Sequence, residues 1–475
     1  MQASAIFVLM NGDGADLFDY ITKQSRPIVV SEALAQYIPS LHPVADKGKR
    51  PDKEVVKPSG INNADGTPIM TTDFANVVRA PLMLQKYIIG QKGSFARGNG
   101  VILKPTIEDD SVFNRVYQNW QQNKTDFDLK EIAVRQMAET QVAVIFYGEK
   151  DKETLDDFRF KYKIVSPIKG DQLFPFYDDD TDDMIAFGRQ YKRGDKSMYD
   201  FYAMNKGGLC DIHKFINGVP KMMDVGEGLQ AQEIIKTKYT KLPIVYWEQD
   251  QGECHDTNGI IEELETGFAD FLTGMGYTAD PILFAKGKAM DMPYKGAPGK
   301  FIETDDAAGD LKFVTPDNAT ESRALQFSLL QKYIFSLNRS VMLDLETLKG
   351  LGAVSGAALE RYLIDVYMDA TDRQQGSWGK GVQRMVNWML SQWMVLDREV
   401  KGLRIDVMFS RYSLQDELER VTLAVKANGN KPVVDLETGV AIANMVDDVK
   451  KTTELIKEET NVPATGSATV MQPVI

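Results

Sequence analysis

The feature that most constrains the fold is one very long helical pattern in the second half of the chain. Apolar residues keep the spacing of a helix from Leu359 to Leu396. At 1.5 Å per residue, a straight helix of about 40 residues extends roughly 60 Å. Gly376, Gly379 and Gly381 lie near its middle, so we expect a kink there. A chain of 475 residues that contains such a helix predicts about three compact regions or one elongated molecule.

Two shorter helical patterns precede the long one, and a Gly/Pro-rich segment separates them. The first covers Asn258–Met275, and the second begins where Asn318 and Glu321 resemble a capping box. Its predicted apolar face consists of Leu325, Leu329, Leu330, Tyr333, Ile334 and Leu337. The segment between the two helices contains the β-forming stretches Ile282–Ala285, Met292–Pro298 and Leu311–Val314. The loop Val341–Val354 then leads to Ser355, a possible cap of the long helix.

The first half of the chain mixes predicted helices and strands. Prolines, glycines and charges alternate over Asp46–Met70, which predicts a flexible arm, with regular order beginning near Asp73. The predicted helices are Phe74–Ile89, Val112–Trp120 and Asp128–Glu139. The predicted strands are Val101–Ile107, Gln141–Tyr147, Met184–Tyr191, Ser197–Met204 and Leu209–Ile216. Turn-forming residues separate the last three strands, so we expect an antiparallel meander there. The apolar stretch Ala3–Met10 is predicted to be a strand or a docking segment.

The charge and cysteine content limit the classes of function. The net charge is −13 and the sequence pI is about 5.0, whereas a protein that grips the DNA backbone is normally basic. An acidic wall can still surround DNA without gripping it, so the charge alone favours no function. No apolar run approaches the ~18 residues of a membrane span. The two cysteines, Cys210 and Cys254, form no metal-binding pair and are expected to be reduced thiols.

No catalytic, metal or cofactor motif is present in the sequence. Each Gly-Lys pair lacks the Ser or Thr that a phosphate-binding loop requires, and the G-x-S-x-G and H-E-x-x-H patterns are absent. The acidic run Asp178–Asp183 fails the EF-hand spacing and is predicted to be a solvated turn. His213 is expected to be structural. The large side chains of the long helix predict core packing rather than a cofactor pocket; they are Trp378, Met385, Trp388, Met389 and Trp393.

The order of elements in the second half resembles the portal proteins of tailed double-stranded DNA bacteriophages, and among them the SPP1-type portals. A helix, a β-rich excursion, a returning helix, a glycine-containing loop and a very long helix follow one another, and Val354–Glu360 opens the long helix. Further similar stretches are Lys86–Gly90, Glu139–Lys150, Ile164–Pro167, Phe176–Asp178, Lys241–Tyr246 and Asp435–Glu459. The resemblance covers about residues 73 to 460. At Glu360–Arg361 many relatives have Leu followed by Lys, so the resemblance does not predict which side chains line the channel there.

The resemblance implies an α+β, mainly helical portal fold with wing, stem, clip and crown regions and a long kinked helix. The implied regions are an N-terminal segment and flexible arm (1–72), wing (73–257), first stem helix (258–276), clip (277–317), second stem helix (318–340), channel loop (341–354), long wing helix (355–399), crown (400–460) and disordered tail (461–475).

The resemblance also implies function, partners and site residues. Portals are not enzymes and need no cofactor; they form a ring, expected to be a dodecamer, at one capsid vertex of the virion. Duplex DNA is packaged and ejected through the ring, which docks the terminase large subunit, contacts capsid and scaffolding proteins, and later binds head-completion or tail proteins. The ring would be assembled in the cytoplasm of the bacterial host. The implied DNA-facing loop residues are Leu345, Glu346, Thr347, Leu348, Lys349, Gly350, Leu351 and Gly352.

Two further groups of residues follow from the same comparison. Four lysines of the clip are expected to meet DNA phosphates or a partner, with a solvated loop equally favoured by the sequence alone: Lys286, Lys288, Lys295 and Lys300. Ser355, Gly356 and Leu359 mark the start of the channel helix. The alternatives are another homo-oligomeric virion scaffold or ring component and, less favoured, a nucleic-acid-processing enzyme.

Overall fold

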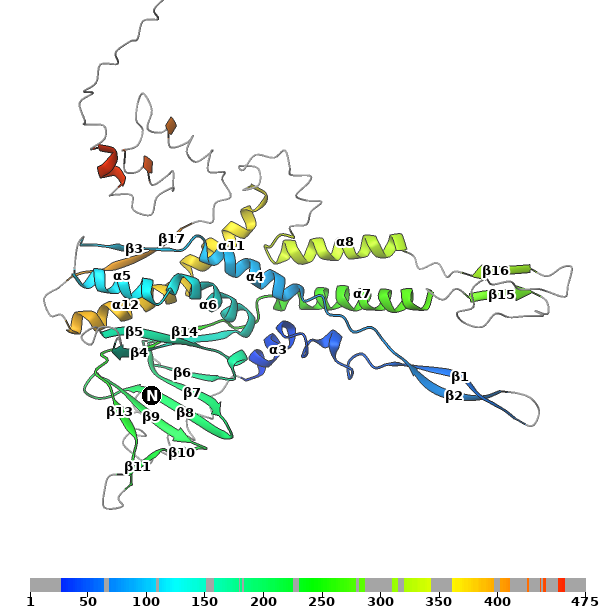
Figure 1. The fold of residues 1–475 in the computed structure, drawn as a ribbon, viewed down its shortest axis with the longest axis horizontal. Helices are drawn as coiled ribbons and strands as arrows, with labels where there is room; N and C mark the ends of the chain where they lie inside the picture. Colours follow the sequence, from blue (N-terminus) through cyan, green and yellow to red (C-terminus); the bar gives the residue numbers. More distant parts are fainter. Residues whose placement is uncertain are drawn as a thin grey trace, which may run out of the picture. The chain divides into compact units, whose positions relative to one another are not determined.

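The computed structural model describes residues 27–63, 68–107, 111–150, 158–178, 180–181, 183–224, 230–278, 282–286, 310–314, 320–342, 361–396 and 402–410, and short pieces at 425–426, 436, 439–440 and 452–457 (Figure 1). The chain divides into two compact units. One comprises Met1–Met342 and Asp365–Arg411, and the other Leu343–Ile364 and Tyr412–Ile475. The elements described below belong to the first unit, apart from Ile364, the first residue of α11.

Helices and strands contribute comparably to the described residues, which makes the fold mixed α/β rather than mainly helical as predicted. The helices are α3 (Pro27–Tyr37), α4 (Leu84–Arg97), α5 (Ser111–Gln122), α6 (Thr125–Glu139), α7 (Asn258–Thr278), α8 (Thr320–Leu337), α11 (Ile364–Gln375) and α12 (Ser377–Leu396). Short 3₁₀ turns lie at Pro43–Ala45, Pro167–Lys169 and His255–Thr257. None of the helices described is long and apolar enough to cross a membrane.

The strands form one larger sheet and several smaller ones. They are β1 (Lys53–Asn62), β2 (Pro68–Ala75), β3 (Val101–Pro105), β4 (Gln141–Lys150), β5 (Phe158–Val165), β6 (Gln172–Tyr177), β7 (Met184–Arg193), β8 (Lys196–Met204), β9 (Cys210–Ile216), β10 (Val219–Pro220), β11 (Met222–Asp224), β12 (Gln230–Gln232), β13 (Ile234–Lys236), β14 (Ile244–Glu248), β15 (Ile282–Lys286), β16 (Asp310–Val314) and β17 (Ile405–Phe409). The largest sheet has the order β10-β9-β8-β7-β6, with β13 also paired to β9. Its antiparallel register confirms the predicted meander.

The main core lies where α12 packs against α5 and the sheet β14-β4-β5. All five large side chains named for the long helix are buried in this core, so the packing prediction is confirmed. Trp388 stacks on Phe146 with ring centroids 4.4 Å apart. Such aromatic pairs add stability beyond the area that they bury. The predicted kink is also confirmed, because α11 ends at Gln375 and α12 begins at Ser377, leaving Gly376 between them.

Two predictions in the first half were wrong. Phe74 belongs to β2, and the helix predicted over Phe74–Ile89 instead runs from Leu84 to Arg97 with Gly90 inside it. Pro81 explains the later start, since proline disfavours helical backbone in the residue before it. The segment Asp46–Met70, predicted to be a flexible arm, contains β1 and the start of β2, so regular structure precedes Asp73, where we expected it to begin. Both strands of a hairpin are edge strands, which tolerate prolines such as Pro68 at the start of β2.

Candidate functional site at the α7–α8 helix pair

Helices α7 and α8 form an antiparallel pair that leads to the β15–β16 hairpin (Figure 1). Near the end of the pair that joins the rest of the unit, Ile261 and Leu264 of α7 pack with Ile334 of α8. Further along, the ring of Phe327 lies within 6.3 Å of the ring centroids of Phe268 and Phe271. The two helices therefore pack against each other through apolar contacts along one face of α7.

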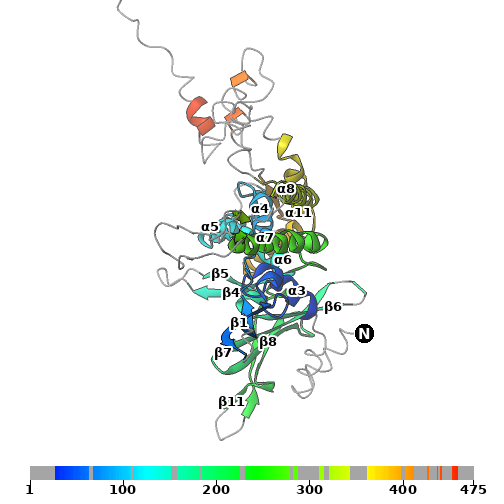
Figure 2. The same ribbon diagram turned by 90° about the vertical axis from the view of Figure 1, so that its right-hand side faces the viewer.

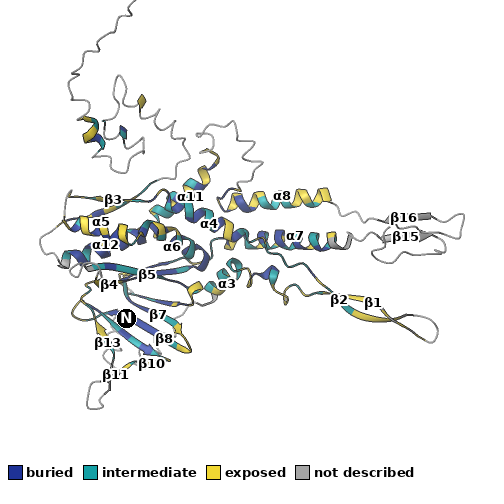
Figure 3. Ribbon diagram, in the orientation of Figure 1, coloured by how far each residue is buried: buried dark blue, intermediate teal, exposed yellow. Residues whose placement is uncertain are grey.

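The opposite side of α8 carries apolar side chains that are exposed to solvent. Four of the six residues predicted as its apolar face are 45% to 62% exposed: Leu325, Leu329, Tyr333 and Leu337. Ile334 is fully buried and Leu330 is partly buried. Figure 3 shows the yellow, exposed face along the length of α8. Apolar residues at spacing four form a continuous stripe on a helix. A contiguous apolar stripe on a surface is typical of a contact with another protein.

A single side chain on α4 fixes the chain that follows α8. The side-chain amide of Gln91 donates a hydrogen bond to the Val341 carbonyl (2.8 Å) and accepts one from the Val341 N–H (2.9 Å). At the end of α8, the Asn338 side chain donates to the Thr257 hydroxyl (2.8 Å). Both backbone groups of Val341 are thus bonded by one amide, which holds the first residue of the predicted channel loop in one register.

The next residue on α4 anchors the long helix through a buried charge network. The Lys92 amino group lies 2.6 Å from the Glu253 carboxylate and 3.3 Å from Asp369 of α11. Arg373, one turn along α11, pairs with the same two carboxylates. Burial opposes the charge of Arg373, but Glu253 and Asp369 outweigh it and raise the pKa of this guanidinium above its ordinary value. Two cations and two anions balance each other, as buried charges require.

The other side of α7 holds a second buried polar group, Glu265. Its carboxylate accepts hydrogen bonds from the backbone N–H groups of Leu82 (3.0 Å) and Met83 (2.9 Å), just before α4 begins. Its second oxygen lies 3.3 Å from Nε2 of His42. Burial raises the pKa of Glu265 and lowers the pKa of His42. The histidine and the carboxylate join the N-terminal segment, α4 and α7 at one buried point.

Most of the site residues predicted from the sequence lie outside the described residues. This holds for the channel-loop residues 345–352, for Ser355, Gly356 and Leu359, and for Lys288, Lys295 and Lys300. Lys286 is the last residue of β15, where its backbone pairs with Asp310 of β16. Sequence reasoning did not single out Gln91, Lys92 or Glu265. The available signal was the spacing of four between Asp369 and Arg373, which predicts an ion pair but not its burial.

The alternative sites considered from the sequence have structural explanations. The acidic run forms a turn between β6 and β7 in which the Asp178 N–H donates to the Asp183 carbonyl (2.9 Å). Within the described ranges, no group of three or more possible metal ligands is found. His213 is buried in the large sheet, in agreement with a structural role.

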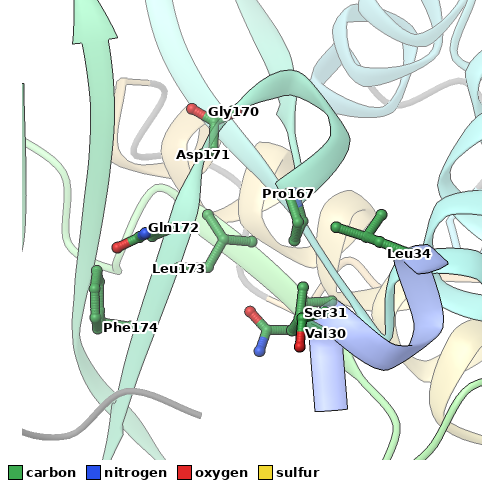
Figure 4. A pocket seen from close by; sticks show the side chains of 10 residues that line it. Val30, Ser31, Leu34, Pro167, Gly170, Asp171, Gln172, Leu173 and Phe174 are labelled. Carbon is green, nitrogen blue, oxygen red and sulfur yellow. The ribbon is translucent and has the colours of Figure 1, made fainter. Parts of the chain in front are cut away.

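A cavity of about 380 Å³ lies between α3, the turn at Pro167 and β6 (Figure 4). Leu34 of α3, Pro167 and Leu173 of β6 line it. Its charged lining residue, Asp171, accepts hydrogen bonds from the Arg189 guanidinium (2.8 Å) and from the Ser166 N–H (3.2 Å). This carboxylate is therefore committed to structural contacts.

The fold and the site define a structural subunit: a projecting helix pair with an apolar outer face, held at its base by buried polar groups. The family model described as phage portal protein, SPP1 Gp6-like, matches residues 73–462, and the chain belongs to this family. Portal proteins are structural rather than enzymatic components of the virion. They have a portal role in tailed phages as an oligomeric ring at a capsid vertex that interacts with capsid and tail proteins. A search of curated proteins finds none that matches the chain.

Proposed function

We propose that this protein forms the ring, expected to be a dodecamer, through which duplex DNA is packaged into the capsid and later ejected. In this proposal α7 and α8 are the stem, the segment 277–317 is the clip, and residues 341–354 are the channel loop. The clip docks first the terminase large subunit and then head-completion or tail proteins, and residues 400–460 form the crown. The observation that carries the proposal is the match of the portal family over residues 73–462.

The geometry around α4 supports the position of the loop. Gln91 holds Val341 on the N-terminal side of residues 343–360, and Lys92 holds Asp369 on their C-terminal side. Adjacent residues of one helix therefore anchor the first residue of the proposed loop and the chain beyond its end. A loop that changes shape as DNA moves past it needs rigid ends, because otherwise its motion would be absorbed by the supporting helices.

The proposal is tested in two stages. Negative-stain electron microscopy of the purified protein at high concentration should show end-on rings with a central hole wide enough for duplex DNA. Deletion of Lys349–Gly352 should then leave the rings intact but reduce DNA packaging in an assay with capsids and terminase. Compact monomers under all assembly conditions would overturn the ring, and unchanged packaging by the deletion would overturn the role of the loop.

A further inference from the structure

We propose that the β1–β2 hairpin of one subunit packs on the exposed apolar stripe of α8 in the neighbouring subunit. This inference rests on the proposed ring, because it names the two surfaces that meet between adjacent copies. In a cyclic ring each subunit contact joins two different surfaces of the same chain, so the chain must carry both halves of the contact. The described residues present two exposed apolar surfaces that fit this requirement.

The first surface is one face of the hairpin. Residues directly opposite each other in an antiparallel pair point to the same face. The register pairs Glu54 with Phe74 and Val56 with Thr72, and Met70 lies two residues before Thr72 on the same face. Val56, Met70 and Phe74 are 64%, 53% and 67% exposed, respectively. A two-stranded hairpin is at best marginally stable alone in water, so a partner on this face would stabilise the hairpin.

The root of the hairpin is rigidly attached, which makes it a defined surface. Arg50, before β1, pairs with Asp270 of α7 at 2.8 Å. Val78, after β2, donates its N–H to the Thr273 hydroxyl of α7 at 3.2 Å. The Arg79 guanidinium closes the root by donating to the carbonyl of Arg50 (2.7 Å) and to the Asp52 carboxylate (2.7 Å).

The two surfaces are attached to opposite sides of α7. Phe268 and Phe271 face α8, whereas Asp270 and Thr273 hold the hairpin root. Residues two apart on a helix are about 200° apart around its axis. In both Figure 1 and Figure 2, α7 accordingly lies between α8 and the hairpin. Copies that follow one another around a ring thus bring the hairpin of one subunit toward α8 of the next.

The surfaces also agree in length and charge. The stripe from Leu325 to Leu337 extends about 18 Å along α8, and the hairpin face from residue 54 to residue 58 extends about 13 Å. Exposed Lys332 flanks the middle of the stripe, and exposed Glu54 lies beside Phe74 on the hairpin face. Glu321 lies about one turn before the stripe, away from Lys332. In the proposed contact, Lys332 of one subunit would pair with Glu54 of the next. An apolar contact flanked by such an ion pair has the composition of a subunit interface.

Disulfide cross-linking between differently tagged copies tests the contact. One copy carries a single new cysteine on the hairpin, in place of Val56, Met70 or Phe74. The other carries one on α8, in place of Leu325, Leu329 or Tyr333. Thr71→Cys, exposed on the opposite hairpin face, is the matched control. The native Cys210 and Cys254 are buried, and burial raises the pKa of each thiol to about 12, so they should stay unreactive.

We expect mixed rings to give hairpin-to-helix cross-links at least about tenfold more often than the Thr71→Cys control. A chain that carries Val56→Cys and Leu329→Cys together should give a ladder of covalent oligomers. Rings that form but cross-link no better than the control would overturn this contact and leave the proposed ring intact. If electron microscopy shows no rings in the unmodified protein, the proposed ring fails, and this contact fails with it.

A charge exchange provides an independent measurement. Glu54→Lys should lower the fraction of protein in rings at low salt, because it places two lysines against each other across the interface. Adding Lys332→Glu to the same chain should restore the fraction. Circular dichroism should confirm that both variants are folded, since both residues are exposed. Failure of the second change to restore assembly would contradict the proposed pairing of these two residues.

Discussion

The Lys92 amino group lies 2.6 Å from the Glu253 carboxylate, and both side chains are at most 9% exposed. The pair links α4 to the segment that enters α7, and Asp369 and Arg373 extend it to α11. The three regions are separated widely in the sequence, so the network forms only when all of them are in place. It therefore ties the proposed stem to the long helix.

Removal of Lys92 should destabilise the protein strongly. In Lys92→Met, the two carboxylates keep Arg373 as their remaining cation, and breaking a buried ion pair costs about 3–5 kcal/mol. We expect a clear decrease in the denaturant midpoint at unchanged slope. The matched control is Arg339→Ala, because the Arg339–Asp372 pair is 52% and 68% exposed and such pairs contribute about 0–1 kcal/mol. Equal effects of the two substitutions would show that the buried network is not a stabilising anchor.

Replacement of Gln91 should loosen the first residue of the proposed channel loop. Gln91→Ala removes the acceptor of the Val341 N–H and one of the two donors to its carbonyl, which keeps the Tyr87 hydroxyl at 3.4 Å; because Val341 is buried, we expect a cost of about 1–3 kcal/mol. Hydrogen exchange at the Val341 amide should become faster, and packaging should decrease while rings persist. Gln383 makes the same kind of bidentate contact with Ile405 (2.8 Å) and Val407 (2.9 Å) of β17 and is the matched control. Gln383→Ala should accelerate exchange in β17 instead, without the change at Val341.

Sequence periodicity predicted the elements whose side chains pack locally. The spacing of Trp378, Met385 and Trp393 predicted the buried face of the long helix, and Gly376 predicted its break. On α8 the same periodicity did not separate the buried Ile334 from the exposed Leu329, because hydrophobicity alone does not say which neighbour covers a residue. Periodicity also failed at Phe74, where an apolar residue lies on an exposed hairpin face.

The anchoring residues of the site were beyond prediction for a different reason. Gln91 and Lys92 lie just beyond the helix predicted over Phe74–Ile89, and Glu265 lies within the helix predicted over Asn258–Met275. All three are ordinary surface-type residues whose role depends on partners more than 150 positions away. A polar residue acquires a partner only through the tertiary fold, so its neighbours in the sequence carry no signal of it. Asn217 and Gly218 are the opposite case, since their turn depends on local backbone alone, with φ of 51° and 80°.

Acid should weaken the large sheet through His213. Burial lowers the pKa of this imidazole below its ordinary 6.5, with Asp211 opposing the shift. The folded state then resists protonation while the unfolded state accepts it, so the free energy of unfolding falls as the pH drops below about 6.5. His213→Phe should reduce this dependence between pH 7.5 and 5, measured by thermal unfolding, while His42, whose pKa burial also lowers, keeps its share. The exposed His255→Gln should keep the dependence of the unmodified protein. An unchanged slope in His213→Phe would assign the acid sensitivity to another group.

Two glycines on helices should respond in opposite directions to the same substitution. A Cβ at Gly381 of α12 would lie 1.9 Å from Nε1 of Trp247, whose N–H donates to the Trp378 carbonyl at 3.0 Å. Gly381→Ala should therefore force the indole away from α12 and cost at least about 1–3 kcal/mol, as overpacking of a core does. A Cβ at Gly90 of α4 would meet nothing within 4 Å.

Gly90→Ala should consequently stabilise the protein by about 0.5–1 kcal/mol, since alanine loses less backbone freedom in a helix than glycine. Thermal and denaturant unfolding of the two variants measure both changes. The fluorescence of Trp247 should also change in Gly381→Ala and not in Gly90→Ala. If Gly381→Ala stabilised the protein, α12 and β14 would have to lie far enough apart to admit a Cβ at Gly381 beside Trp247. The core around the long helix would then tolerate more volume than its packing indicates.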